Sequence, residues 1–549
     1  MFRRPFPGFA AKEKTMSVRV RFAPSPTGNV HIGNIRVAIF NWLFARHNDG
    51  TFLLRIEDTD RERSTPEAIA NLFSVMEWLG LDYDERPLYQ STQQQHHLEA
   101  AERLIAAGHA YRAAKGGGGE AVLFRIPVSD DLPCVSNAGM TEIQVHAEVP
   151  VEIDGSGIRY ATVSRKGKPV PQNGCLAGFR DLSILDSEGN VVYEIEDELD
   201  AVIDGRSSAC VENAVALKFR RRHVILQDHV KGKLTKPLDS LRDQVIVRSD
   251  GTPVFHLANI CDDLTQKVTH IVRGDDHVEN TYRHILLYHA LGETPPRYAH
   301  LPMIVNQQGK PYSKRDGDAF VGDFRQKGYL PEALFNYLSL LGWSPGDDRE
   351  KLSRRELTEL FSLDRVQRTA AQMDVRKLDN LNSLYMSELP FDEFLSSARK
   401  VAREYEWGRQ ADEDYFRQVA ALMQSRTKNF AQVGDWEYFF LTDISYDAKA
   451  CRKFLRKDGI DAALQLVLDK LQGAEFTPGS VETAIHETTE ACGIRQGKLN
   501  QPLRVAVTGT TVGPGIYETM AVLGSERVRR RIQHAIDTFC GPAENGAAS

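Results

Sequence analysis

The hydrophobic pattern near the start of the chain predicts a strand, a loop and a helix, in that order. Apolar and charged residues alternate over residues 18–22, as they do in a short strand with one buried face. Two prolines and a glycine in residues 24–28 predict a loop, and apolar residues then recur at helical spacing over 35–43. His31 and Gly33 therefore lie where the loop enters the helix. We expect free N–H groups and a partial positive charge there, which suit a phosphate.

Three later segments have the pattern of strands that lead to polar residues. Residues 51–56 read as a buried strand, and Glu57 follows at its carboxyl end, where open parallel sheets bind ligands. A second strand is predicted over 254–258, after an Asp-Gly turn, and a third over 268–272. Arg273 comes just past the third strand, so this pattern predicts that it lies on the same ligand-binding side.

The rest of the pattern divides the chain into a strand-rich middle and a helical end. Residues 121–240 are rich in β-branched residues and in Gly, Asn and Asp, which predicts short strands joined by turns. Four glycines at 116–119 predict a flexible linker before them. From Tyr329 onward helical periodicity dominates, beginning with an apolar helix over 333–341 that ends at a glycine.

The composition is that of a large globular protein, and it does not identify a partner. The chain has 549 residues, enough for roughly three or four domains, and a net charge of −7. This charge alone does not predict a nucleic-acid partner. Basic runs at 218–222, 231–236 and 527–531 read as solvated faces, and become candidates for RNA-backbone contacts only if other motifs imply RNA. No apolar run is long enough to cross a membrane.

The cysteines and the first residues indicate the cellular setting. Seven cysteines are scattered without a C-x-x-C pair, which argues for a reducing cytoplasm and against both a disulfide framework and a tetrahedral zinc site. Residues 1–16 lack an apolar core of signal-peptide length. We expect them to be a short targeting piece or, with Met16 as the initiator, the product of a misassigned start.

Several motifs resemble those of one enzyme family. Residues 21–34, Arg-Phe-Ala-Pro-Ser-Pro-Thr-Gly-Asn-Val-His-Ile-Gly-Asn, resemble the signature of class I aminoacyl-tRNA synthetases, and within them of the glutamyl enzymes. The run Arg-Ile-Glu-Asp-Thr-Asp-Arg at 55–61 and the lysine loop at 309–317 are similar to two further motifs of these enzymes. The helical stretch at 503–532 resembles the last domain of the bacterial type. The resemblance covers most of the chain outside residues 1–16 and 116–213.

This resemblance implies a fold class and a domain order. The fold class is α/β, with a Rossmann-like catalytic domain split by an inserted α+β domain and followed by all-α stem-contact and anticodon-binding domains. The expected boundaries are 17–112 and 248–325 for the two halves of the catalytic domain, 113–247 for the inserted acceptor-stem-binding domain, 326–390 for the stem-contact domain and 391–549 for the helical anticodon-binding region. The segment 116–213 matches the family poorly, and we assign it no role from the sequence.

The resemblance also implies which residues bind each substrate. The glutamate pocket is expected to consist of Arg21, Ser25, Glu57, Phe255, Asn259 and Arg273. ATP is expected to bind at His31, Gly33, Asn34, Ser313, Lys314 and Arg315, with His31 and Lys314 catalytic and no metal ligand from the protein. In this pattern Glu57 receives the substrate ammonium group, and the two arginines face its side-chain carboxylate. Paired guanidinium groups suit a carboxylate, and glutamine would leave their donors underpaired.

Three positions depart from the family pattern. Phe255 stands where the family usually has tyrosine, so a hydroxyl that contacts substrate would be lost, at about 1 kcal/mol. Pro311 replaces a lysine of the lysine loop and restricts its backbone, and Asp316 replaces a histidine. Lys314, the residue assigned to the phosphates, is retained, so the chemistry is expected to survive.

The implied activity is ATP-dependent ligation of L-glutamate to tRNA-Glu through a glutamyl-adenylate, with Mg²⁺ offsetting the charge of ATP. We expect a cytoplasmic monomer without a membrane partner. Three alternatives stay open: an enzyme that also charges tRNA-Gln with glutamate, a catalytically silent tRNA-binding paralogue, and a nucleotidyltransferase that shares only the His-Ile-Gly loop.

Overall fold

The structure, a computed structural model, describes residues 17–60, 62–114, 119–128 and 132–540. The predicted start at Met16 and the linker at 116–119, apart from Gly119, lie outside the described residues. The chain divides into two compact units. The first contains the residues up to 321 together with 338–373, and the second contains 322–337 and the residues from 374 onward.

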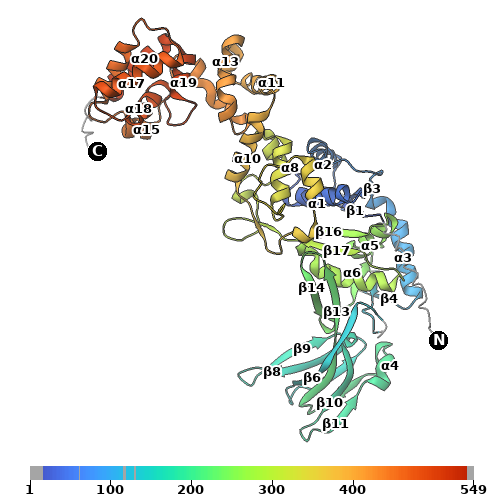
Figure 1. The fold of residues 1–549 in the computed structure, drawn as a ribbon. Coiled ribbons are helices and arrows are strands. Elements are labelled where there is room, and N and C mark those ends of the chain that lie inside the picture. The colour runs from blue at the N-terminus through green and yellow to red at the C-terminus, as the bar shows by residue number, and fades with distance from the viewer. Residues whose placement is uncertain (1–16, 61, 115–118, 129–131, 541–549) are drawn as a thin grey trace, which may run out of the picture. The chain divides into compact units, whose positions relative to one another are not determined.

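The first half of the α/β region is a parallel sheet with helices between its strands (Figure 1). In order along the chain it contains β1 (Arg19–Phe22), α1 (Ile32–His47), β2 (Thr51–Ile56), α2 (Pro66–Trp78), β3 (Leu88–Tyr89) and α3 (Gln94–Ala106). β2 lies in the middle, paired in parallel with β1 and β3, and its residues 52–56 are buried. Burial on both faces is typical of parallel strands. The predicted strand–loop–helix order and the predicted strand 51–56 are confirmed.

The second half of this region lies beside β1. It consists of α5 (Phe255–Thr265), β16 (His270–Gly274), α6 (Val278–Ala290) and β17 (Arg297–Leu301). The Thr269 N–H donates to the Arg19 carbonyl, 2.9 Å away, and the Arg19 N–H donates to the Thr269 hydroxyl, 2.8 Å away. These bonds join the beginnings of β1 and β16. The carboxyl ends of β1, β2 and β16, which carry Arg21, Glu57 and Arg273, are thereby brought near one another.

Two details of the sequence prediction for this half are wrong. The predicted strand 254–258 is the start of helix α5, in which all residues from Leu257 to Asp263 are buried. The apolar run was too short to separate the two periods, because the helical pattern becomes clear only when the polar residues up to Thr265 are included. Arg273 lies inside β16, one residue before its end, rather than just past it.

The middle of the chain is rich in strands, as predicted. Its strands are β4 (Ala110–Ala114), β5 (Glu120–Phe124), β6 (Val135–Gln144), β7 (Val151–Asp154), β8 (Gly157–Val163), β9 (Pro169–Gly174), β10 (Phe179–Leu185), β11 (Val191–Glu194), β12 (Ala209–Val211), β13 (Ala216–Asp228), β14 (Gly232–Pro237) and β15 (Gln244–Val247), with a short helix, α4 (Leu199–Ile203), among them. Strands β7, β8, β9 and β12 form one sheet, and β6, β10, β11 and β14 gather around β13. An apolar core of its own lies between these strands.

Strand β13 joins the strand-rich middle to the parallel sheet. It pairs along most of its length with β6, β10 and β14, and its last residue, Asp228, pairs in parallel with Tyr298 of β17 (Figure 1). Asp228 is 6% exposed. The carboxylate of Asp228 therefore enters the α/β region from the end of a 13-residue strand of the insertion.

The later part of the chain is mainly helical, as the periodicity predicted. Its elements are β18 (Ile304–Val305), α7 (Val321–Gln326), α8 (Pro331–Leu340), α9 (Arg354–Leu360), β19 (Ala371–Gln372), α10 (Val375–Glu388), α11 (Phe391–Ala402), α12 (Glu406–Gln410), α13 (Glu413–Met423), α14 (Glu437–Phe440), α15 (Ala448–Phe454), α16 (Ile460–Lys470), α17 (Pro478–Ala491), α18 (Gly497–Thr508), α19 (Ile516–Leu523) and α20 (Ser525–Phe539). Helices α10 to α20 share one apolar core. Of the described helices, none has both the length and the apolar character needed to span a bilayer.

The basic runs singled out in the sequence are largely engaged within the protein. Arg220 and Arg221 pair with Asp181 and Asp239, while Lys231 and Lys236 pair with Asp275 and Glu279. In the last run, Arg530 pairs with Asp443, and Arg531 is buried and donates to three backbone carbonyls. These runs therefore carry less free positive charge than their sequence suggests.

Candidate active site

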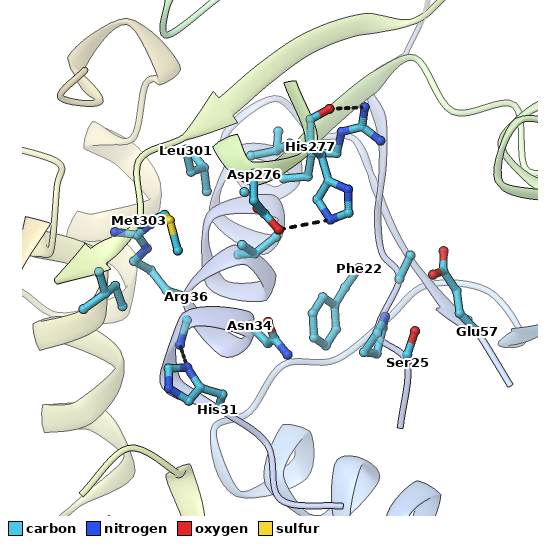
Figure 2. Close-up of a pocket in the computed structure, with 18 of the residues that line it drawn as sticks. Phe22, Ser25, His31, Asn34, Arg36, Glu57, Asp276, His277, Leu301 and Met303 are labelled. Atoms are coloured by element: carbon cyan, nitrogen blue, oxygen red, sulfur yellow. Dashed lines mark hydrogen bonds and ion pairs between the residues drawn. The ribbon is translucent and has the colours of Figure 1, made fainter. Parts of the chain in front are cut away.

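A cavity of about 660 Å³ opens at the carboxyl end of β1, in front of the start of α1 (Figure 2). Residues of the β1–α1 loop, of α1, α5 and β16, and of the segments 301–304 and 311–312 line it. The predicted site residues that it brings together are Arg21, Ser25, His31, Gly33, Asn34, Glu57, Phe255, Asn259 and Arg273. Ser313, Lys314 and Arg315 do not line it.

His31 caps the helix that follows it. It is the N-cap of α1, and its Nδ1 accepts the Gly33 N–H at 3.0 Å. A Cβ atom at position 33 would lie 3.1 Å from this Nδ1, so glycine makes room for the capping ring. Burial lowers the pKa of His31, more than the nearby Tyr312 carbonyl raises it. The ring is therefore neutral at pH 7, and because Nδ1 accepts, Nε2 carries the proton and can donate it.

The expectation of free N–H groups at this helix end is wrong. The Ile32 N–H donates to the Ala319 carbonyl at 2.9 Å, the Gly33 N–H to the His31 ring, and the Asn34 N–H to the His31 carbonyl at 3.0 Å. The chain itself satisfies these donors, since the segment after the lysine loop returns to this point. What this end of α1 can offer an anion is the His31 Nε2–H and the helix dipole.

Two buried guanidinium groups lie at one end of the cavity. Arg21, 4% exposed, uses its Nε to bind Asp263 at 2.9 Å, and its two Nη atoms make no hydrogen bond to the described residues. Arg273, 6% exposed, donates from Nε to His300 at 3.3 Å and from Nη2 to the Thr281 hydroxyl at 2.6 Å. Its buried Nη1 has no hydrogen-bond partner within the described part of the chain. Burial, with a further contribution from Arg21, lowers the pKa of Arg273 to about 10.

Glu57 and Asn259 form a second polar group of the cavity. Glu57 Oε1 accepts from Arg55 Nη2 at 3.2 Å and from Asn259 Nδ2 at 3.1 Å. Burial raises the pKa of Glu57, against the opposing effect of Arg55. The Asn259 Oδ1 is buried and has no hydrogen-bond donor among the described residues. Ser25 lies beside Glu57 (Figure 2). Glu57 and Asn259 therefore offer hydrogen-bond acceptors to a ligand, whereas Arg21 and Arg273 offer donors.

Sequence reasoning missed the two residues that connect these groups. Arg55, fully buried, bridges Asp263 at 2.5 Å and Glu57, and Asp263, 1% exposed, also binds Arg21. Positive and negative charges thus alternate along the four side chains, which keeps each ion paired in the interior. Arg55 stood in the quoted motif but was assigned no role. Asp263 was hidden by the wrong strand prediction, since only a helix places it one turn after Asn259.

The lysine loop is held next to His31, but its residues Ser313, Lys314 and Arg315 do not line the cavity. Lys314 begins the 3₁₀ turn Lys314–Asp316, where the Ser313 hydroxyl and N–H both donate to Asp316 at 2.9 Å and Asn306 donates to it at 2.7 Å. The exposed Lys314 makes no ion pair within the described residues. Tyr312, before the turn, lines the cavity, and residues 319–321 bond to residues 30–32. Asp316, which replaces a family histidine, therefore fastens the turn.

We expect His31→Asn to separate capping from catalysis. Asparagine is a good N-cap, so the melting temperature should stay near that of the unchanged protein, whereas alanine should destabilise the protein by about 1 kcal/mol. Both variants remove the Nε2–H, and ATP–pyrophosphate exchange should fall by roughly 10²-fold in each. Thermal melting and the exchange assay measure the two effects, and near-normal exchange in His31→Asn contradicts the role given to Nε2.

Comparison with known protein families assigns both the catalytic and the helical regions. Residues 17–117 and 198–380 match the catalytic domain of the class I tRNA synthetases (E and Q), and residues 393–536 match an anticodon binding domain. The catalytic match leaves out residues 118–197. The poor match noted in the sequence at 116–213 overlaps this gap.

The chain is also similar to named proteins over nearly its whole length. A glutamate–tRNA ligase from Desulforudis audaxviator is 34% identical over 95% of this chain and 96% of its own. Glutamate–tRNA ligase 2 from Rhodospirillum rubrum is 37% identical over 95% of this chain and 99% of its own. A solved structure of a glutamate tRNA ligase from Elizabethkingia meningosepticum, in complex with its amino acid, has 28% identity and a TM-score of 0.65, covering 95% of this chain and all of the other.

Proposed function

Because the chain belongs to the class I tRNA synthetases of the E and Q type, we propose that it uses ATP to ligate L-glutamate to tRNA-Glu. The glutamate α-carboxylate attacks the α-phosphorus of ATP, which gives glutamyl-adenylate and releases pyrophosphate. A ribose hydroxyl of the terminal adenosine of the tRNA then attacks the mixed anhydride, and AMP leaves. No protein nucleophile is needed, so catalysis rests on positioning and on stabilising charge.

The observation that carries this proposal is the state of Arg273. A buried guanidinium group is normally paired, because an unpaired buried charge is strongly unfavourable. Arg273 has no carboxylate within ion-pairing distance among the described residues, and its Nη1 has no partner. The free Nη atoms of Arg21 lie in the same cavity. The missing partner is an anion, and the side-chain carboxylate of glutamate supplies it, whereas the glutamine amide does not.

The other polar group of the cavity fits the α-ammonium group. The carboxylate of Glu57 and the unpaired Asn259 Oδ1 are both acceptors, and an ammonium group supplies donors to both. Asn259 donates to Glu57, which fixes the direction of its amide. An amino acid with a cationic end here and an anionic end at the two arginines matches the polarity of the cavity.

The phosphates belong at the His31 end. His31 Nε2–H and Lys314 would act on the triphosphate, with Gly33, Asn34, Ser313 and Arg315 around it. We propose that Mg²⁺ enters with ATP and is held by the phosphates, since no group of three or more His, Cys, Asp or Glu side chains in the described residues is placed to bind a metal ion.

We propose the remaining parts of the chain as tRNA-binding regions. The insertion at 113–247 would bind the acceptor stem, 326–390 the stem below it, and 391–549 the anticodon, which is supported by the match of residues 393–536 to an anticodon binding domain. The protein would act as a monomer in the cytoplasm.

Charging assays test the proposed function directly. Purified protein should attach glutamate, and not glutamine, to tRNA-Glu when ATP and Mg²⁺ are present. ATP–pyrophosphate exchange with glutamate, measured with and without tRNA, separates this activity from that of another nucleotidyltransferase. Charging of tRNA-Gln with glutamate identifies a relaxed enzyme. Absence of both exchange and charging, with tRNA binding retained, contradicts the proposal and identifies a silent paralogue.

Phe255→Tyr tests the departure from the family pattern. The ring of Phe255 is half-buried in the cavity wall and surrounded by His256, His277 and His284 at 5.6–5.9 Å between ring centres. Restoring the hydroxyl should retain activity and lower the KM for glutamate by up to about five-fold, the equivalent of about 1 kcal/mol for one hydrogen bond. Steady-state charging at varied glutamate measures it, and a clearly raised KM shows that this ring is wrongly placed in the pocket.

A further inference from the structure

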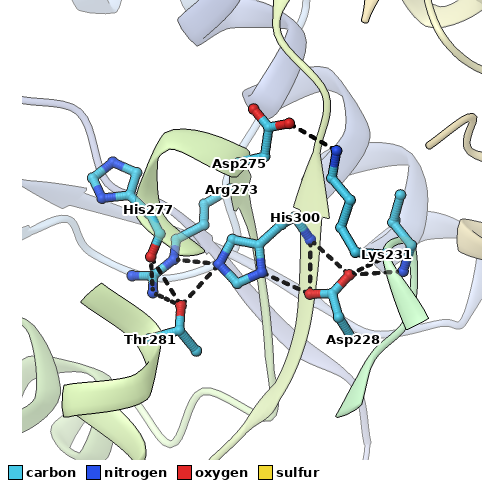
Figure 3. A network of polar contacts seen from close by, with 8 residues as sticks. Asp228, Lys231, Arg273, Asp275, His277, Thr281 and His300 are labelled. Atoms are coloured by element: carbon cyan, nitrogen blue, oxygen red, sulfur yellow. Dashed lines mark hydrogen bonds and ion pairs between the residues drawn. The ribbon is translucent and has the colours of Figure 1, made fainter. Parts of the chain in front are cut away.

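Arg273 is held by neutral groups on two neighbouring elements. His300 of β17 accepts from its Nε, and the Thr281 hydroxyl of α6 and the His277 carbonyl both accept from its Nη2 (Figure 3). The Thr281 hydroxyl lies 2.9 Å from His300 Nε2 and 3.0 Å from the His277 carbonyl. Of the five donors of the guanidinium group, those on Nη1 are left for a ligand.

The protonation of His300 decides whether this arrangement is possible. Its Nε2 can accept from Arg273 only if Nε2 carries no proton. His300 Nδ1 lies 2.6 Å from Asp228 Oδ2, and a carboxylate accepts there only from an Nδ1–H. Burial lowers the pKa of His300, more than Asp228 raises it, so the ring is neutral. The contact with Asp228 therefore selects the Nδ1–H form and leaves the Nε2 lone pair facing Arg273.

Asp228 is itself fixed as an acceptor. Besides the His300 ring it receives the backbone N–H groups of Val230 at 2.9 Å, Lys231 at 2.7 Å and His300 at 3.1 Å (Figure 3). Burial alone would raise the pKa of Asp228, but these hydrogen bonds outweigh burial and lower it. Four donors converge on this carboxylate, two from the residues that follow β13 and two from His300 of β17, and together they fix its position and favour its charged form.

We propose that Asp228 and His300 are positioning residues for glutamate recognition: Asp228 fixes the tautomer of His300, and His300 orients Arg273 so that Nη1 faces the substrate carboxylate. This rests on the proposed function of Arg273. Neither residue touches substrate. The strand that leads out of the strand-rich insertion thereby contributes, through its last residue, to amino-acid specificity.

Asp228→Asn is the sharpest test of this chain of contacts. An asparagine amide presents N–H groups to a site that already holds four donors, so the His300 ring is expected to shift to the Nε2–H form, which opposes Arg273. His300→Leu removes the acceptor altogether. Each variant should raise the KM for glutamate by about ten-fold, because one charge-assisted hydrogen bond of Arg273 is lost. The KM for ATP should change by less than about two-fold.

His300→Gln and Lys231→Met are the matched controls. Glutamine keeps a neutral acceptor towards Arg273, so it should restore the KM for glutamate to within about three-fold of the unchanged protein. Lys231→Met removes the neighbouring ion pair with Asp275, of 2.7 Å, and leaves the Asp228–His300–Arg273 contacts in place. Its KM for glutamate should be unchanged. If Asp228→Asn melts too early to assay, Thr281→Val, which removes the other acceptor of Arg273, should show the same selective rise.

The outcomes distinguish this proposal from the function on which it rests. If the unchanged protein charges tRNA with glutamate but the Asp228 and His300 variants keep their KM values, or lose activity equally for glutamate and ATP, the positioning role is overturned alone. The same holds if His300→Gln is as impaired as His300→Leu. If the unchanged protein neither binds nor charges glutamate, the proposed function and this inference both fall.

Discussion

We expect Arg273→Met to remove nearly all glutamate charging and to make the ligand-free protein more stable. In the proposed function, the guanidinium group of the unchanged protein would meet the substrate carboxylate in a buried site, where charge-assisted hydrogen bonds are strong. Without it, the bound carboxylate is left with Arg21 alone. We expect kcat/KM for glutamate to fall by roughly 10³-fold, the result of losing two such bonds and leaving a charge partly unpaired.

The increase in stability follows from the same burial. The pKa of Arg273 is lowered to about 10 because the folded protein disfavours the charged form, and this penalty is present at every pH below that value, including neutral pH. Methionine has a similar volume and no charge. After the substitution, the Thr281 hydroxyl still lies 2.9 Å from His300 Nε2 and can donate to it, so the ring keeps a partner. We expect the unfolding free energy to rise by about 1 kcal/mol or more.

Thermal melting with and without glutamate, together with charging assays, measures both effects. Glutamate should raise the melting temperature of the unchanged protein, because it binds only the folded state, and should not raise that of Arg273→Met. Arg297→Met, a substitution of an exposed arginine on the neighbouring strand β17, should leave charging and melting unchanged. A variant at position 273 that retains the KM for glutamate would falsify the assignment of this cavity to the amino acid.

The parts of the fold that could be predicted are those with a strong local pattern. The strand at 51–56 and the helix entered at His31 follow from hydrophobic period and from turn residues, both of which are local properties of the chain. Helix α5 was missed because its first residues form an apolar run that fits either period. The strand order, by contrast, depends on contacts such as Asp228 with Tyr298, which no local pattern contains.

For the site, the sequence indicated the residues at the cavity surface better than those behind it. Arg21, Glu57 and Arg273 were identified by motifs, and the structure brings them into one cavity. Asp263 and His300 could not be identified, because an isolated acidic residue or histidine has no distinctive spacing. The state of Arg273, a buried cation whose partners are neutral, depends on residues up to 27 positions away and is visible only in the folded chain. Likewise, only the structure shows that the His31 ring accepts a hydrogen bond from the Gly33 N–H.

Lys314 is the second residue whose substitution should have a large effect, in this case on the reaction of ATP. His31 already lines the cavity, while Lys314 is exposed on a turn whose two ends are fixed next to His31. An ammonium group on this turn is a point charge on a flexible stem, which suits the triphosphate. We expect Lys314→Ala to lower kcat for charging and the rate of ATP–pyrophosphate exchange by roughly 10²- to 10³-fold, as for other single groups that stabilise transition-state charge.

Because Lys314 is exposed and unpaired among the described residues, Lys314→Ala should leave the melting temperature and the KM for glutamate unchanged. These two measurements distinguish Lys314→Ala from Arg273→Met. Lys310→Ala, an exposed lysine on the same loop, is the matched control and should retain exchange. Lys314→Arg should recover part of the activity, since it keeps the charge but not the compact ammonium group. If Lys314→Ala and Lys310→Ala both retain nearly full charging and exchange activity, the role of Lys314 is contradicted. The loop then only encloses the cavity, and the charge on the phosphates is stabilised by His31 and the metal ion that accompanies ATP.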